Sequence, residues 1–172
     1  MNKEQIQAEL TKQLADGTTN PFQQSLTHGI GCCEIEAADS LACSLHWIDY
    51  TSSVLSQLAD HALKDFSDQL ASRLTYLLEP ICTIEVDPDV VQLRSQPPSC
   101  NTEDGSRSYF ELLARPGRLR LVRYQKQVGE PRHETTIHFT HEVVARLFLD
   151  FDLATGEVAA AGTLTSTDES LF

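Results

Sequence analysis

The stretch "IHFTHEVVARLFLDFD", Ile137–Asp152, decides the fold because it fits two kinds of secondary structure. Read with a period of two, the alternate residues from Ile137 to Phe151 form one largely apolar face of a long strand. Read with a period of 3.6, Thr140 caps a helix whose apolar stripe consists of Val143, Val144, Leu147 and Phe151. Because the alternation is long and the Val143-Val144 pair is β-branched, we expect a strand.

The same stretch contains two histidines that suggest a metal site. On a strand, His138 and His141 point to opposite faces and cannot bind one ion together. On a helix their spacing of three still differs from the H-E-x-x-H motif, in which the histidines are four apart. We therefore predict no metal and no other cofactor, and we expect His141 to be partly buried and hydrogen-bonded to backbone.

Two hairpins and a further pair of strand-like pieces are expected around this segment. Downstream, "DLATGEVAA" (152–160) reads as a turn into a further strand. Upstream, "YFELLARPGRLRLVRYQK" (109–126) predicts a hairpin around Pro116-Gly117, with Phe110, Leu112 and Ala114 on one face of its first arm. Before it, "ICTIEVDPDVVQLRS" (81–95) contains two strand-like pieces separated by Asp87-Pro88-Asp89, which suggests a bulge, a bend or a tight turn.

The first half of the chain supplies the helices and another hairpin. Residues 3–15 have the apolar spacing of a short amphipathic helix, and residues 33–47 alternate as a hairpin around Ala38-Asp39-Ser40. From Thr51 to Leu77 the apolar residues recur at steps of three and four, which predicts one long helix capped by Thr51 or Ser52 and ended by Pro80.

These elements predict an α+β fold. We expect an antiparallel sheet of about five to seven strands, with one long helix packed across a face and a short N-terminal helix. The 172 residues suit a single domain, with an N-terminal helix and loop over 1–28 and a core over 29–165.

Composition narrows the location and the partners. The formal net charge is −12, which argues against nucleic-acid binding, since neutralising phosphates needs a basic surface. No segment reads as a targeting signal or as a membrane span, so we expect no membrane contact. The five cysteines show no C-x-x-C spacing and read as reduced packing residues, so we expect a cytoplasmic protein.

Positive charge is concentrated in one segment. Residues 106–132 hold seven of the thirteen lysines and arginines. Arg118 and Arg120 share a strand face and Arg123 lies on the other, so these arginines are candidates for binding an anionic ligand. Two alternatives are open: ion pairs within the sheet to Glu142, Asp150 and Asp152, or contact with the acidic surface of a second copy.

The absence of catalytic motifs leaves two hypotheses for function. The first is a non-catalytic protein-binding or adaptor module that acts through its sheet face, is dimeric, and uses the apolar residues of the second sheet face: Val122, Tyr124, Val144 and Phe148. The alternative is a small-molecule-binding protein or enzyme with a pocket between the long helix and a curved sheet. Its polar groups would be His46, Tyr50 and His141, with the arginines at the rim for an anionic ligand.

Overall fold

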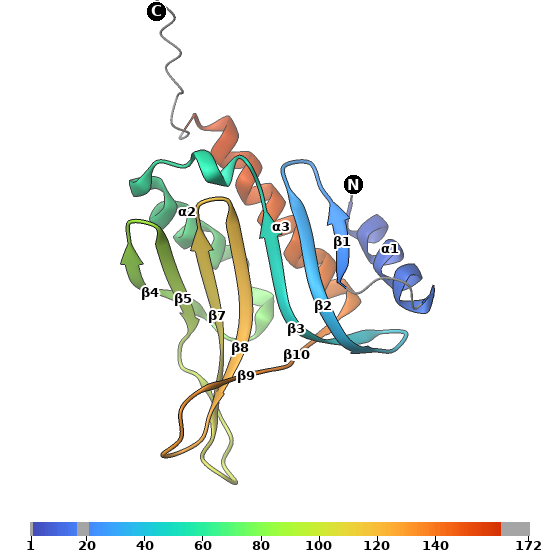
Figure 1. Cartoon of the computed structure of the whole chain (residues 1–172), viewed down its shortest axis with the longest axis vertical. Helices are drawn as coiled ribbons and strands as arrows, with labels where there is room; N and C mark the ends of the chain where they lie inside the picture. Colours follow the sequence, from blue (N-terminus) through green and yellow to red (C-terminus); the bar gives the residue numbers. More distant parts are fainter. Residues whose placement is uncertain (1, 17–20, 163–172) are drawn as a thin grey trace, which may run out of the picture.

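The structure is a two-layer α+β arrangement of three helices on one antiparallel sheet (Figure 1). The computed structural model describes residues 2–16 and 21–162. The predicted loop after Asp16 therefore lies partly outside the described residues, at 17–20, as do residues 163–165 of the predicted core. The helices are α1 (Lys3–Asp16), α2 (Asp60–Arg73) and α3 (His141–Ala160), and short 3₁₀ turns at Leu55–Gln57 and Thr75–Leu77 flank α2.

Seven strands follow one another across the sheet in the order β1-β2-β3-β8-β7-β5-β4, each antiparallel to its neighbour. Short strands β6, β9 and β10 pair with β7, β8 and β3. The predicted α+β fold with its antiparallel sheet is confirmed. The bounds of the seven are β1 (Phe22–Ser25), β2 (Ile30–Ala38), β3 (Ala42–Thr51), β4 (Ile81–Asp87), β5 (Val90–Ser95), β7 (Arg107–Arg115) and β8 (Arg118–Lys126), and the short strands are β6 (Ser99–Cys100), β9 (His133–Thr135) and β10 (Ile137–Thr140).

The expected strand over Ile137–Asp152 is wrong after its first four residues. β10 ends at Thr140, whose side chain accepts a hydrogen bond from the Val143 backbone N–H and caps α3. Of the helical stripe predicted as the alternative, Val144, Leu147 and Phe151 are buried and Val143 is partly buried, and Phe148 and Ala145 are buried with them. The expected turn at 152–160 is also wrong, because these residues continue α3.

The long helix lies at a different place in the chain from the one predicted. Residues 51–77 form only the 14-residue α2 and its flanking 3₁₀ turns, whereas α3 has 20 residues. Thr51 belongs to β3, and the Ser52 hydroxyl donates to the His28 carbonyl instead of capping a helix. The periodicity is nevertheless real, since Leu55, Phe66 and Leu70 are buried in the core.

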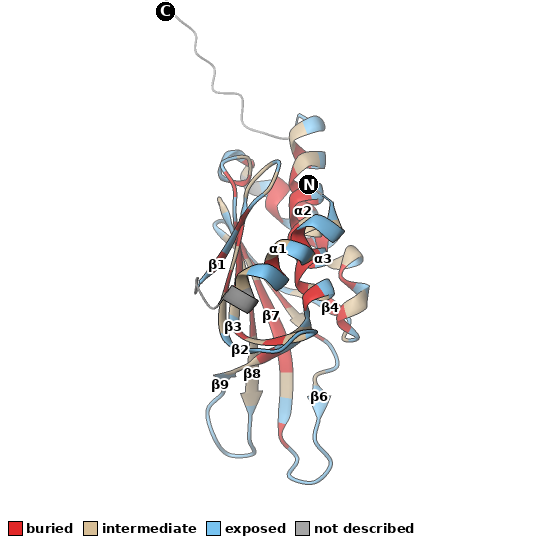
Figure 2. Ribbon diagram, turned by 90° about the vertical axis from the view of Figure 1, so that its right-hand side faces the viewer, coloured by how far each residue is buried: buried red, intermediate tan, exposed pale blue. Residues whose placement is uncertain are grey.

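All three helices cover the same face of the sheet, which we call the inner face (Figure 2). α3 crosses the sheet with α1 on one side and α2 on the other. Its close approach requires Gly31 on β2, because a Cβ there would lie 2.6 Å from the ring of the fully buried Phe148. Val144 and Phe148 therefore belong to the core, which corrects their assignment to the second sheet face.

No helix of the described residues lies on the opposite face, which we call the outer face (Figure 2). Tyr109 and Val122 are buried on this face, apart from the main core. Arginine side chains lie flat over its aromatic rings: Arg94 over Tyr109, Arg120 over Trp47 and Arg132 over Tyr124. Long side chains of this kind cover apolar surface with their stems while the charged heads remain near water.

Within the described residues, no helix is long and apolar enough to cross a bilayer.

Candidate functional site: a basic cleft on the outer sheet face

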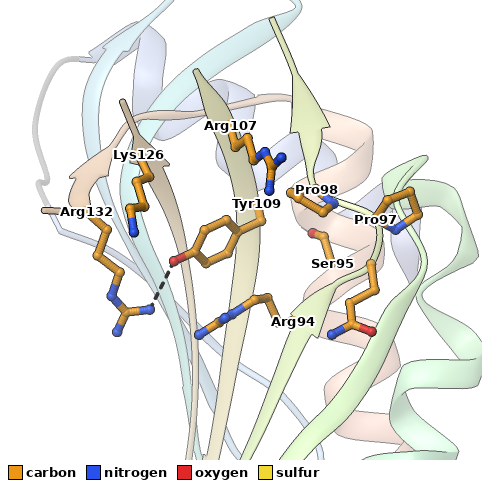
Figure 3. Close-up of a pocket in the computed structure, with 9 residues that line it drawn as sticks. Arg94, Ser95, Pro97, Pro98, Arg107, Tyr109, Lys126 and Arg132 are labelled. Carbon is orange, nitrogen blue, oxygen red and sulfur yellow. Dashed lines mark hydrogen bonds between the residues drawn. The ribbon is translucent and has the colours of Figure 1, made fainter. Parts of the chain in front are cut away.

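A cleft of about 670 Å³ lies at one end of the outer face, where β7 and β8 extend beyond β5 (Figure 3). We call it the basic cleft. It is bounded by the turn that follows β5 and by cationic and aromatic side chains from three strands and one loop. Its lining residues are Arg94, Ser95, Gln96, Pro97, Pro98, Arg107, Tyr109, Lys126 and Arg132.

Sheet register brings the four cations of this cleft together. β7 lies between β5 and β8, so that Arg94 is opposite Glu111 and Arg107 is opposite Lys126. Arg132 reaches the cleft from the loop between β8 and β9. Figure 3 shows Tyr109 at the centre, with Arg107 and Pro98 on one side and Lys126 and Arg132 on the other.

Two of these cations are held in place by a buried carboxylate. Glu111 is only 2% exposed, and its Oε2 accepts hydrogen bonds from Gln92 at 2.6 Å, Arg132 at 2.7 Å and Arg94 at 3.3 Å. Arg94 also stacks 4.7 Å above the Tyr109 ring, and Arg132 stacks 4.1 Å above Tyr124. The two guanidinium groups are therefore ordered before any ligand arrives.

Local hydrogen bonding keeps Arg132 charged. Its Nη1 donates to the Tyr109 hydroxyl at 3.2 Å as well as to Glu111. These bonds raise the pKa of the guanidinium above its already high ordinary value. Burial, aided by the nearby Glu111 carboxylate, raises the pKa of the Tyr124 phenol, so this ring stays neutral beside the arginine.

The other two cations have no counter-charge. Arg107 and Lys126 are exposed, and neither side chain makes a hydrogen bond or ion pair with any residue that the structure describes. They are nevertheless directly opposite each other on paired strands. Like charges in that position destabilise a sheet. The basic cleft thus carries four positive charges against the single negative charge of Glu111.

A second arginine cluster on the outer face also carries an excess of positive charge, around a carboxylate of its own. Asp49 on β3 is 9% exposed and accepts from Arg118 and, at 3.2 Å, from Arg120. Arg120 in turn stacks 4.9 Å above Trp47. The exposed Arg115 lies directly opposite Arg118, so this cluster has three cations for one carboxylate, whereas the basic cleft has four.

The residues named from the sequence do not form one site. Arg118 and Arg120 lie in the Asp49 cluster, and Arg123 lies on the inner face, where it stacks on Phe110 and donates to Glu79 at 2.9 Å. All three are thus in internal ion pairs, but Glu142, Asp150 and Asp152, the partners considered above, bind elsewhere. Glu142 pairs with Lys3, Asp150 lies 3.9 Å from Arg146, and Asp152 accepts from backbone N–H groups and from Tyr50.

The three residues expected to line a pocket are also separated. His46 is exposed at an irregularity of β3, whereas Tyr50 is buried and its hydroxyl donates to Asp152 at 2.8 Å. His141 is buried in the first turn of α3, and its Nδ1 lies 3.1 Å from the Thr11 hydroxyl of α1, a side-chain contact rather than the expected backbone one. Among the described residues, no group of three histidine, cysteine or acidic side chains is placed to hold a metal ion.

Part of the cleft could have been found from the sequence. The hairpin around Pro116-Gly117 sets its own register, and that register places Arg107 opposite Lys126. The positions of Arg94, Glu111 and Arg132 could not be predicted in this way, because they depend on which strand lies beside β7 and on the path of the loop after β8.

No protein-family model, curated protein or solved structure matches the chain.

Proposed function

We propose that the protein is a non-catalytic binding protein that holds an anionic ligand in the basic cleft on its outer sheet face. The observation that supports this proposal is the pair Arg107 and Lys126, two cations opposite each other that pair with no carboxylate among the described residues. Their repulsion lowers the stability of the unliganded sheet. A bound anion would remove that repulsion, so binding would stabilise the fold.

Preorganisation of the cleft is the second support. Glu111 and the two tyrosine rings already hold Arg94 and Arg132, so a ligand would order only Arg107 and Lys126. Immobilising a long side chain costs about 0.5–1.5 kcal/mol on binding, and fewer such side chains favour higher affinity. The lining consists of cations, prolines, a hydrogen-bonded tyrosine, Gln96 and Ser95, whose hydroxyl accepts from the Phe110 backbone N–H, and this set suits recognition better than bond cleavage.

This proposal retains the sheet face of the adaptor hypothesis and the anionic ligand of its alternative. A nucleic-acid or membrane partner is disfavoured by the net charge of −12, since an extended anionic surface would meet acidic side chains around the cleft. A cytoplasmic location is part of the proposal. All five cysteines are free thiols, the form that a reducing compartment maintains.

The experiment is a calorimetric titration with two small anions, pyrophosphate and tricarballylate, at low ionic strength. We expect at least one of them to bind, with affinity that falls as salt is added. Lys126→Gln should weaken binding by about tenfold. Arg115→Gln is the matched control, because Arg115 is an exposed arginine on β7 at the other end of the same hairpin. If neither anion binds, or if both variants weaken binding equally, the proposal is wrong.

The predicted homodimer remains a separate proposal. It is supported by β4, an edge strand of the sheet that exposes Ile84 and Val86. Exposed apolar edges of this kind favour association with another chain.

A further inference from the structure

The shape and charge of the basic cleft define the ligand more closely, provided that the proposed function holds. We infer that the ligand is a small phosphorylated organic molecule whose phosphoryl group lies between Arg107 and Lys126. Four observations carry this inference: the charge of the pair, the geometry of its donors, the proline wall and the acidic loops beyond the cleft.

Charge matching favours a phosphate monoester over a carboxylate. Arg107 and Lys126 together present two unpaired positive charges on adjacent strands. A phosphate monoester carries about −1.5 to −2 at neutral pH, whereas a single carboxylate carries about −1. Only the phosphate neutralises both cations at once.

Donor geometry points the same way. A guanidinium offers a planar fork of N–H groups, and an ammonium offers three donors on a flexible stem. A phosphoryl group has three terminal oxygens that can accept from both partners. Arg107 begins β7 and Lys126 ends β8 directly opposite it, so the two side chains start from neighbouring positions at the open end of the hairpin, on either side of Tyr109 (Figure 3).

The remaining space suits an organic group attached to the phosphate. Pro97 and Pro98 form one wall of the cleft beside Arg107 (Figure 3), and neither residue has a backbone N–H that would need a polar partner. The volume of about 670 Å³ exceeds what one phosphate fills and lies within the usual range for small-molecule sites.

A long polyanion fits the surroundings less well than a small ligand. The loops next to β7 and β8 carry Glu103, Asp104 and Glu130, all exposed. Asp104 lies three residues before Arg107, and Glu130 lies four residues after Lys126. These carboxylates would repel further phosphates of a nucleic acid or of a membrane surface within the screening distance of about 8–10 Å.

Three ligands that share one phenyl ring test the inference by calorimetry at pH 8: phenyl phosphate, phenyl sulfate and benzoate. Phenyl sulfate has the tetrahedral shape of the phosphate with a single negative charge. We expect phenyl phosphate to bind at least tenfold more tightly than the other two. Because the second pKa of a phosphate monoester is about 6, this advantage should shrink to less than threefold at pH 5.

Two variants connect the affinity to the proposed pair. Arg107→Gln and Lys126→Gln should each weaken phenyl phosphate binding by about tenfold, and Arg115→Gln should leave it unchanged. Circular dichroism and thermal unfolding establish that each variant is folded; removing a repelling charge should not lower the melting temperature of the unliganded protein.

Different outcomes separate the inference from the function on which it rests. If all three ligands bind equally and depend on Arg107 and Lys126, the anion-binding function stands and the phosphate inference is overturned. If none binds at millimolar concentration, both are overturned. If a short oligonucleotide, or a vesicle containing anionic lipid, binds at least tenfold more tightly than phenyl phosphate through the same pair, the small-molecule inference is overturned.

Discussion

At the scale of single residues, Glu111 has the strongest influence on the outer face. It is a nearly fully buried carboxylate that accepts from Gln92, Arg94 and Arg132. Glu111→Gln keeps the shape but removes the charge that balances two guanidinium groups. We expect the free energy of unfolding, measured by urea denaturation, to fall by about 1–2 kcal/mol. This loss is smaller than is usual when a buried ion pair is broken, because both arginines can be rehydrated.

The matched control for this prediction is Glu134→Gln. Glu134 lies on the neighbouring strand β9, is exposed, and makes only a long contact of 3.5 Å with the Tyr124 hydroxyl. Its substitution should change the free energy of unfolding by no more than about 0.5 kcal/mol. Equal losses in the two variants would show that Glu111 does not organise the cleft.

The thiols should differ sharply in reactivity. Cys33 and Cys43 are buried, and burial raises the pKa of Cys43 to about 11 and also raises the pKa of Cys33. Since the thiolate is the reactive form, both should resist alkylation, whereas the exposed Cys82 and Cys100 should react first. Brief treatment with iodoacetamide followed by peptide mass spectrometry measures the order. Labelling of Cys33 as fast as Cys82 in the native protein would contradict this arrangement.

At the scale of elements, the fold depends on how closely α3 approaches β2. A Cβ at Gly31 would lie within 2.8 Å of three atoms of the Phe148 ring. We expect Gly31→Ala to lower the free energy of unfolding by about 1–3 kcal/mol, the usual cost of overpacking. Adding Phe148→Leu should recover part of that loss, so that the double variant is more stable than the sum of the two single effects predicts. Strict additivity would mean that the two residues do not share this contact.

The edge strand β4 is the element on which self-association can be tested. No described strand pairs with its far side, and Ile84 and Val86 are 36% and 48% exposed there. If two copies associate through this edge, Val86→Lys should yield a folded monomer, because a lysine on an edge strand opposes pairing. Val128→Lys, in an exposed loop, is the control. Analytical ultracentrifugation reports both, and a wild-type protein that remains monomeric at high concentration would show that the dimer prediction is wrong.

At the scale of the whole molecule, acidic residues make stability depend on pH. Several carboxyl groups have pKa values below the ordinary 3.8 of aspartate or 4.5 of glutamate, because they accept hydrogen bonds in the folded state: Asp39, Asp68, Glu79, Asp104 and Glu142. A lowered folded pKa stabilises the protein above the ordinary value, and this stabilisation is lost as the pH falls through the folded pKa. The free energy of unfolding should therefore decline below about pH 4.5.

One group acts in the opposite direction. Burial raises the pKa of Asp150, so its contribution to folding is fully present below the ordinary value of 3.8 and is lost as the pH rises through the raised folded pKa. The lowered groups outnumber it, so the net loss on acidification should persist. In Glu79→Gln the decline below pH 4.5 should be shallower, since one of the contributing carboxyl groups is absent. Urea unfolding at a series of pH values measures both slopes, and an unchanged slope would contradict the role assigned to Glu79.

Local patterns in the sequence were sufficient for the sheet. Alternating residues on both sides of Pro116-Gly117 and of Ala38-Asp39-Ser40 predicted two hairpins, and both are present. A further hairpin joins β4 to β5 at Asp87-Pro88-Asp89, where the sequence left a bulge, a bend and a tight turn open. A hairpin turn pairs residues close in sequence, so its register follows from the turn itself. The like-charged pair Arg107 and Lys126 was therefore determined by sequence alone, although it was recognised only in the structure.

Tertiary structure decided what those patterns left open. Ile137–Asp152 fits both periods, and only burial of Phe148 against Gly31 and the cap at Thr140 made it helical after four residues. The basic cleft forms because β5 lies beside β7. This pairing places Arg94 next to Glu111, which lies seventeen positions later in the sequence. Such contacts depend on which strands become neighbours, and that choice is made by burying the whole inner face beneath three helices rather than by any short stretch of sequence.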